Sequence, residues 1–180
     1  MINKIIVKQN EELVLPVIWN GKEKEINYDI SLSEAGASIK FLMLLLGRGI
    51  SAVNININII HQKPQTKSIV IIKGILKNSS SIDFNGLVKI NKGSNLANAW
   101  LGAHLLLLSD KAKGRAVPSL EILENDVKAG HATTVGKLDE LEIFYLMSRG
   151  LSKVQAKQFI VKGFLSGFLK EFPKNFKYEL

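Results

Sequence analysis

Val53–Ile59 reads Val-Asn-Ile-Asn-Ile-Asn-Ile, so apolar and polar residues alternate at every position. Successive side chains of a β-strand point to opposite faces of a sheet, and this pattern therefore predicts a strand with one buried and one exposed face. Ile26–Leu32 shows the same alternation. Further β-rich runs, separated by Gly, Asn, Ser or Pro, follow at Ser68–Leu76, Ile82–Ile90, Leu105–Leu108 and Leu120–Ile122.

The spacing of these runs fits either a β-sandwich or the turns of a β-helix, also called a β-solenoid. Asn54, Asn56 and Asn58 favour the solenoid, because polar side chains stacked from turn to turn share hydrogen bonds. Plain exposure to water explains the asparagines nearly as well. The chain has no clean internal repeat, so the residues alone leave both architectures open.

The last quarter of the chain predicts two helices. Asp139 and Glu142 have the spacing of a capping box, and Gly150 is suited to end the helix that starts there. Ser152 and Gln155 repeat the capping box before a second amphipathic helix. Its predicted apolar stripe comprises Ala156, Phe159, Ile160, Gly163, Phe164 and Phe168. We therefore expect an all-β core over residues 1–136, and a helical segment with a loosely held tail over 137–180.

Composition excludes several functional classes. The 180 residues include no cysteine, which excludes disulfides, a thiolate nucleophile and a metal or cluster site built on this chain's own sulfur. The net charge of +8 comes from scattered lysines without a recognition motif, so we expect no nucleic-acid partner. No signal peptide or membrane-length apolar run is evident, and we expect a cytoplasmic protein with no membrane partner.

Several ordered motifs resemble the SufB/SufD family of iron–sulfur cluster assembly proteins. Four lie near the C-terminus: Pro118–Ile122, Asp126–Lys128, His131–Gly136 and Phe144–Leu151. Upstream segments that resemble the family's solenoid are His61–Ser68, Lys73–Leu76, Phe84–Gly86 and Leu106–Asp110. The resemblance implies a right-handed parallel β-helix followed by a helical pair. It also implies a scaffold without enzymatic activity that binds a SufC-like ABC-type ATPase and pairs with a SufB-like paralogue or a second copy.

Two departures make the chain look like SufD, or like a reduced relative of both types. The family cysteine of SufB-type chains falls on or near Lys113, and Ala132 follows His131 where SufB-type chains tend to have a glutamate. The resemblance thus implies a transient iron–sulfur cluster at a subunit interface, with none bound by the isolated chain. His131 is the candidate ligand, and Glu121 is a weaker one. The alternative is a structural role, in which His131 hydrogen-bonds a backbone group at the end of the solenoid.

The candidate partner-binding residues lie in the two predicted helices. They are Phe144, Tyr145, Arg149, Phe159, Phe164 and Phe168. Two other functions stay open at this point. One is a purely structural or degenerate solenoid subunit without cluster chemistry. The other is a carbohydrate-active β-helix enzyme, which requires paired acids across a groove that no motif singles out.

Overall fold

The computed structural model describes residues 2–172, which form ten strands followed by two helices. The strands are β1 (Ile2–Val7), β2 (Glu12–Trp19), β3 (Glu25–Leu32), β4 (Ser38–Gly47), β5 (Ala52–His61), β6 (Lys67–Leu76), β7 (Ser81–Ile90), β8 (Asn98–Leu107), β9 (Lys113–Ile122) and β10 (Lys128–Lys137). The helices are α1 (Glu140–Ser148) and α2 (Lys153–Leu169). The part of the predicted tail at residues 173–180 lies outside the described residues.

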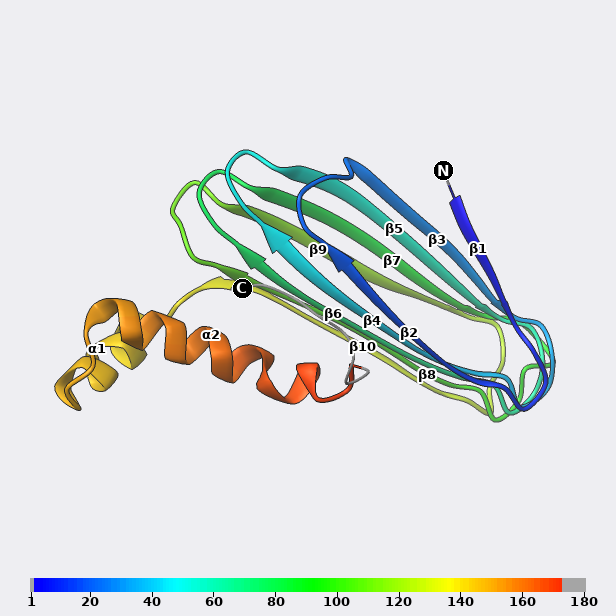
Figure 1. The fold of residues 1–180 in the computed structure, drawn as a ribbon. Helices are drawn as coiled ribbons and strands as arrows, with labels where there is room; N and C mark the ends of the chain where they lie inside the picture. The colour runs from blue at the N-terminus through cyan, green and yellow to red at the C-terminus, as the bar shows by residue number, and fades with distance from the viewer. Residues whose placement is uncertain (1, 173–180) are drawn as a thin grey trace.

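The strands wind into a parallel β-solenoid of five turns. The odd-numbered strands form one sheet in the order β1-β3-β5-β7-β9, and the even-numbered strands form the other in the order β10-β8-β6-β4-β2. All neighbouring strands are parallel, and the two sheets lie face to face as two layers, as Figure 1 shows. The parallel solenoid expected from the family resemblance is confirmed, and the sandwich alternative is wrong.

The alternating residues divide between the core and the outer surface as predicted. Ile55, Ile57 and Ile59 of β5 are fully buried between the sheets. On the outer face of the odd sheet, the Asn56 amide donates to Asn27 Oδ1 and the Asn58 amide donates to Asp29 Oδ1, each at 2.9 Å. These bonds connect successive turns, so the stacked asparagines stabilise the turn-to-turn register as expected.

β4 is buried on both of its faces. Its inward side chains, such as Phe41, enter the core, whereas Leu42 and Leu44 point to the outer face and pack against Leu165 and Phe168 of α2. Figure 1 shows α2 lying along the outside of the even sheet. The continuous apolar sequence of this strand follows from this double burial.

Local caps define the two helices. Asp139 accepts a hydrogen bond from the Leu141 amide at 2.8 Å, but Glu142 does not bond back, so the full capping box predicted there is wrong. Ser152 and Gln155 do form the complete box. Gly150 follows α1 with φ of +95°, a backbone conformation that favours glycine. No helix among the described residues has the length and apolar character needed to cross a membrane.

Candidate functional site

The last turn of the solenoid, formed by β9 and β10, carries His131. Its position in β10 continues a row of inward-facing side chains that runs through all even strands: Leu15, Phe41, Val70, Leu101 and His131. Leu101 is fully buried, but His131 is exposed because no further turn of the described residues covers it. The apolar stack therefore ends in an imidazole at the open end of the solenoid.

The His131 ring makes no hydrogen bond within residues 2–172, so the structure offers no support for a backbone-bonding role. β9 and β10 are edge strands of their respective sheets, and their outer edges present unpaired backbone groups. Exposed apolar side chains gather on this turn and the loop within it: Val117, Ile122, Leu123 and Val135. This open last turn has the features of a surface that pairs with another β-structure.

Glu121 is held away from His131. Its carboxylate lies 2.7 Å from the Lys89 ammonium on the neighbouring strand, and its side chain alternates to the outer face of the odd sheet. No group of three or more His, Asp or Glu side chains arranged to hold a metal occurs within residues 2–172. Lys113, at the position that resembles the family cysteine, is an exposed residue at the start of β9. The described chain therefore supplies one imidazole here, not a complete ligand set.

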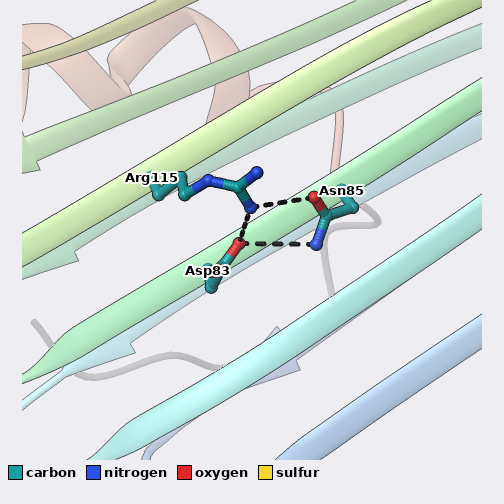
Figure 2. Close-up of polar contacts among 3 residues, drawn as sticks. All are labelled: Asp83, Asn85 and Arg115. Carbon is teal, nitrogen blue, oxygen red and sulfur yellow. Dashed lines mark hydrogen bonds and ion pairs between the residues drawn. The ribbon is translucent and has the colours of Figure 1, made fainter.

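Polar groups on the outer face of β7 and β9 satisfy one another. Arg115 donates to Asp83 Oδ1 at 2.7 Å and to Asn85 Oδ1 at 3.0 Å, and the three side chains form the triangle drawn in Figure 2. The contact ties the last turn to the preceding one. Because the charges are already paired, this cluster has a structural role and is not a ligand site.

The other two histidines have structural roles. His61 is fully buried, and its ring nitrogens lie 2.8 Å from the hydroxyls of Thr66 and Ser68. Burial lowers the pKa of His61 to about 4, which keeps the ring neutral at physiological pH. His104 bonds Thr134 across β8 and β10 at 2.9 Å, and burial, with a smaller effect of Lys73, lowers its pKa.

A second candidate surface is the groove between α1 and α2, which we call the α1–α2 groove. It has a volume of about 640 Å³ and is lined by Leu141, Glu142, Tyr145, Leu146, Phe159, Ile160, Gly163 and Phe164. Phe159 of the lining is 61% exposed, and Phe144 of α1, which is not part of the lining, is 69% exposed. The guanidinium of Arg149 lies 5.4 Å from the centre of the Tyr145 ring, which fixes the aromatic wall. Such an exposed apolar groove on a water-facing helical pair is typical of a protein-docking site.

The predicted apolar stripe of α2 is divided between two environments. Phe168 is buried against the even sheet, whereas Phe159 faces water. Lys73 of β6 lies 4.4 Å from the centre of the Phe164 ring and donates to the Phe164 carbonyl oxygen. Phe168 and Phe164 therefore hold α2 on the solenoid, and Phe164 also contributes to the α1–α2 groove.

Comparison with known proteins decides the family. The family model described as "SUF system FeS cluster assembly, SufBD core domain" matches residues 8–164. The chain belongs to this family. It is 41% identical over 130 residues to the iron–sulfur cluster assembly protein SufD of Bacillus subtilis, covering 72% of this chain and 30% of that protein. It is 32% identical over 121 residues to SufB of the same organism, covering 67% of this chain and 26% of SufB.

A SufBD family protein of Mycobacterium bovis is 34% identical over 121 residues, with 67% of this chain and 14% of the relative covered. The chain thus spans less than a third of the length of these curated relatives. The SufBD match covers the solenoid from residue 8 and most of α2, and it includes both the open last turn and the α1–α2 groove.

Five residues of the α1–α2 groove were not among the partner-binding residues predicted from the sequence. They are Leu141, Glu142, Leu146, Ile160 and Gly163. Glu142 was assigned to a capping box, and Ile160 and Gly163 were assigned to the apolar stripe. A helical glycine opposite exposed aromatic residues was the available signal, because it leaves space on a helix surface where a side chain would otherwise stand.

Proposed function

We propose that this chain is a cytoplasmic scaffold subunit for iron–sulfur cluster assembly, without enzymatic activity of its own. The observation that carries the proposal is the open last turn, where an exposed imidazole ends the core row at two unpaired sheet edges. Family membership supplies the cluster-assembly context, since the curated relatives are named for that process. The cluster is cargo that forms between subunits.

The partner at the open last turn is a second solenoid, either a SufB-like paralogue or another copy. Pairing the edges of β9 and β10 satisfies their backbone groups and covers the exposed apolar side chains there. A cysteine-bearing partner also provides the thiolate that this chain lacks. We expect the isolated protein to purify without colour, because one imidazole does not enclose a cluster.

The α1–α2 groove binds the ATPase subunit, which resembles SufC. Six of its eight lining residues are apolar or glycine, the seventh is Tyr145, and the eighth, Glu142, is the single charged residue. An apolar groove with one acidic group suits a partner segment with a large apolar anchor and a nearby basic residue. Phe144, Tyr145 and Phe159 are the aromatic contacts, with Arg149 positioning the Tyr145 ring.

Co-purification with the ATPase tests this docking. Deleting residues 137–180 is a poor test, because it uncovers Leu42 and Leu44 on the outer face of β4. Replacing both Phe144 and Phe159 by Ser removes exposed side chains only and should abolish co-purification. Val154→Ser is the matched control, since Val154 is equally exposed on the other flank of α2. Full retention of the ATPase by the double variant would refute docking at this groove.

Anaerobic reconstitution of the full complex with iron and sulfide tests the role of His131. Loss of cluster occupancy in His131→Ala supports ligation by the imidazole. Equal occupancy in the variant supports the second candidate, a structural subunit that shapes the site without ligating the cluster. The absence of cysteine favours that alternative. A carbohydrate-active enzyme has less support, because neither large surface groove beside α2 contains two carboxylates.

A further inference from the structure

A second groove lies on the opposite flank of α2, between that helix and the turns that follow β6 and β8. We call it the lysine groove. Its volume is about 470 Å³, and it is lined by Lys77, Leu108, Val154, Lys157, Gln158, Val161 and Lys162. The lining combines three apolar side chains with three ammonium groups and contains no acid. It therefore differs in charge from the α1–α2 groove, whose only charged lining residue is Glu142.

The positive charge of the lysine groove is not balanced within the described chain. α2 contains no acidic residue between Lys153 and Leu169, and none of the ion pairs within residues 2–172 involves Lys77, Lys157 or Lys162. Lys157 interacts electrostatically with Asp110, but the Asp110 carboxylate already accepts a hydrogen bond from the Lys137 ammonium at 2.7 Å. The helix dipole adds positive potential at the N-terminal end of α2, close to Lys157. A complementary occupant is acidic at its rim and apolar at its centre.

One exposed segment of this chain has that chemistry. α1 begins with Glu140, Leu141 and Glu142, and Leu141 is 76% exposed, followed by the exposed Phe144. Neither glutamate takes part in an ion pair within residues 2–172. α1 packs on its own α2 through Ile143 and Ala156, on the side away from the lysine groove. The exposed face of α1 is thus available to another molecule.

We propose that the lysine groove binds α1 of a second copy of this chain. Leu141 and Phe144 of one copy pack against Leu108, Val154 and Val161 of the other, and Glu140 and Glu142 pair with the groove lysines. Each copy offers both the helix and the groove, so we propose that two copies exchange α1 reciprocally in a two-fold dimer. Leu141 and Glu142 also line the α1–α2 groove, so this contact and ATPase docking exclude each other. That last consequence rests on the proposed function.

The absence of cysteine makes a site-specific crosslinking test clean. A Leu141→Cys chain is mixed with a Gln158→Cys chain under mild oxidation, and mixed disulfides are quantified by mass spectrometry. Each chain has one thiol, so every disulfide joins two molecules, and efficient bonding requires Cα atoms within about 7 Å. We expect the 141–158 product to exceed the product of Leu141→Cys with a Lys92→Cys control at least about tenfold, since Lys92 lies on an exposed turn away from α2.

Charge reversal then identifies the pairing. Glu142→Lys in the first chain, or Lys157→Glu in the second, should each lower the 141–158 yield about tenfold, and combining them should restore it. Lys153→Glu is the control on α2 outside the groove lining. An absent 141–158 product, or loss without restoration in the charge-swapped pair, would overturn the proposal. ATPase co-purification by Lys157→Glu should not fall, because Lys157 lies outside the α1–α2 groove and loss of the competing contact leaves α1 free. A fall would indicate a failure of docking at the α1–α2 groove, separate from a failure of the proposed dimer contact.

Discussion

Gly163 of α2 offers the sharpest test of the α1–α2 groove. A Cβ atom built at this position meets no atom within 4 Å, although the residue lines the groove. The position therefore has space for a Cβ, and Gly163→Leu places an apolar side chain at the groove. Removing a glycine from a helix interior also raises the free energy of unfolding by about 0.5–1 kcal/mol. The variant should be more stable than the wild type and defective in ATPase binding.

The size of the binding defect follows from the anchor that the groove accepts. Burying one large apolar side chain contributes about 1.5–3 kcal/mol, so blocking that site should weaken binding by about 10- to 150-fold. Gly167→Leu is the matched control, because Gly167 is also in α2, has equal space around it and lies outside the groove lining. Both variants gain the helix stability, but only Gly163→Leu should lose affinity.

Isothermal titration with the purified ATPase gives the affinities, and urea unfolding gives the stabilities. Wild-type affinity in a folded Gly163→Leu protein would refute the assignment of the groove as the docking site. Equal losses in both glycine variants would show that α2 matters through its backbone and not through the open space at Gly163.

Three further predictions concern stability. Burial lowers the pKa of His61 from 6.5 to about 4, so the folded protein holds the ring neutral where the unfolded chain would protonate it. About 3 kcal/mol of the free energy of unfolding should therefore be lost as pH falls from 6.5 to 4. Urea titrations should show a smaller loss in His61→Gln. Phe168→Ala should cost about 3–5 kcal/mol and increase dye binding by uncovering Leu42, and an unchanged urea midpoint would contradict the packing of α2. His131→Ala should change the free energy of unfolding by less than about 0.5 kcal/mol, since the exposed ring has no described partner; a larger loss by thermal unfolding would indicate a structural role.

The local pattern predicted much of the secondary structure because that information lies within short segments. Alternation in Val53–Ile59 follows directly from the two faces of a strand, and the caps at Ser152 and Gly150 act within one helical turn. β4 does not alternate, so local periodicity did not predict that both of its faces are buried. Its outer face is covered by α2, which follows more than one hundred residues later in the chain.

The candidate site was predictable only in part. The resemblance identified His131, but periodicity did not reveal that its row is fully buried at Leu101 and open one turn later. Glu121 was close to His131 in sequence, yet strand alternation and the ion pair with Lys89 separate them. Phe159 and Phe168 share one helix, and only the position of the sheet determines that the first is exposed and the second buried.

The sequence by itself determined the strand faces, the helix caps and the absence of a thiolate, since each depends on residue identity or on neighbours within a few positions. The tertiary structure decided which surfaces stay open. Turns about thirty residues apart stack on one another, as Asn27, Asn56 and Asn85 show. Within residues 2–172 this stacking leaves the sheet edges at β9 and β10 unpaired at one end of the solenoid, as it does those at β1 and β2 at the other. α2 packs on β4 and has a groove on each flank. The lysine groove is lined by three lysines, whereas the only charged residue that lines the α1–α2 groove is Glu142. Burial depends on what covers a side chain, and in this fold the covering residues come from distant parts of the chain.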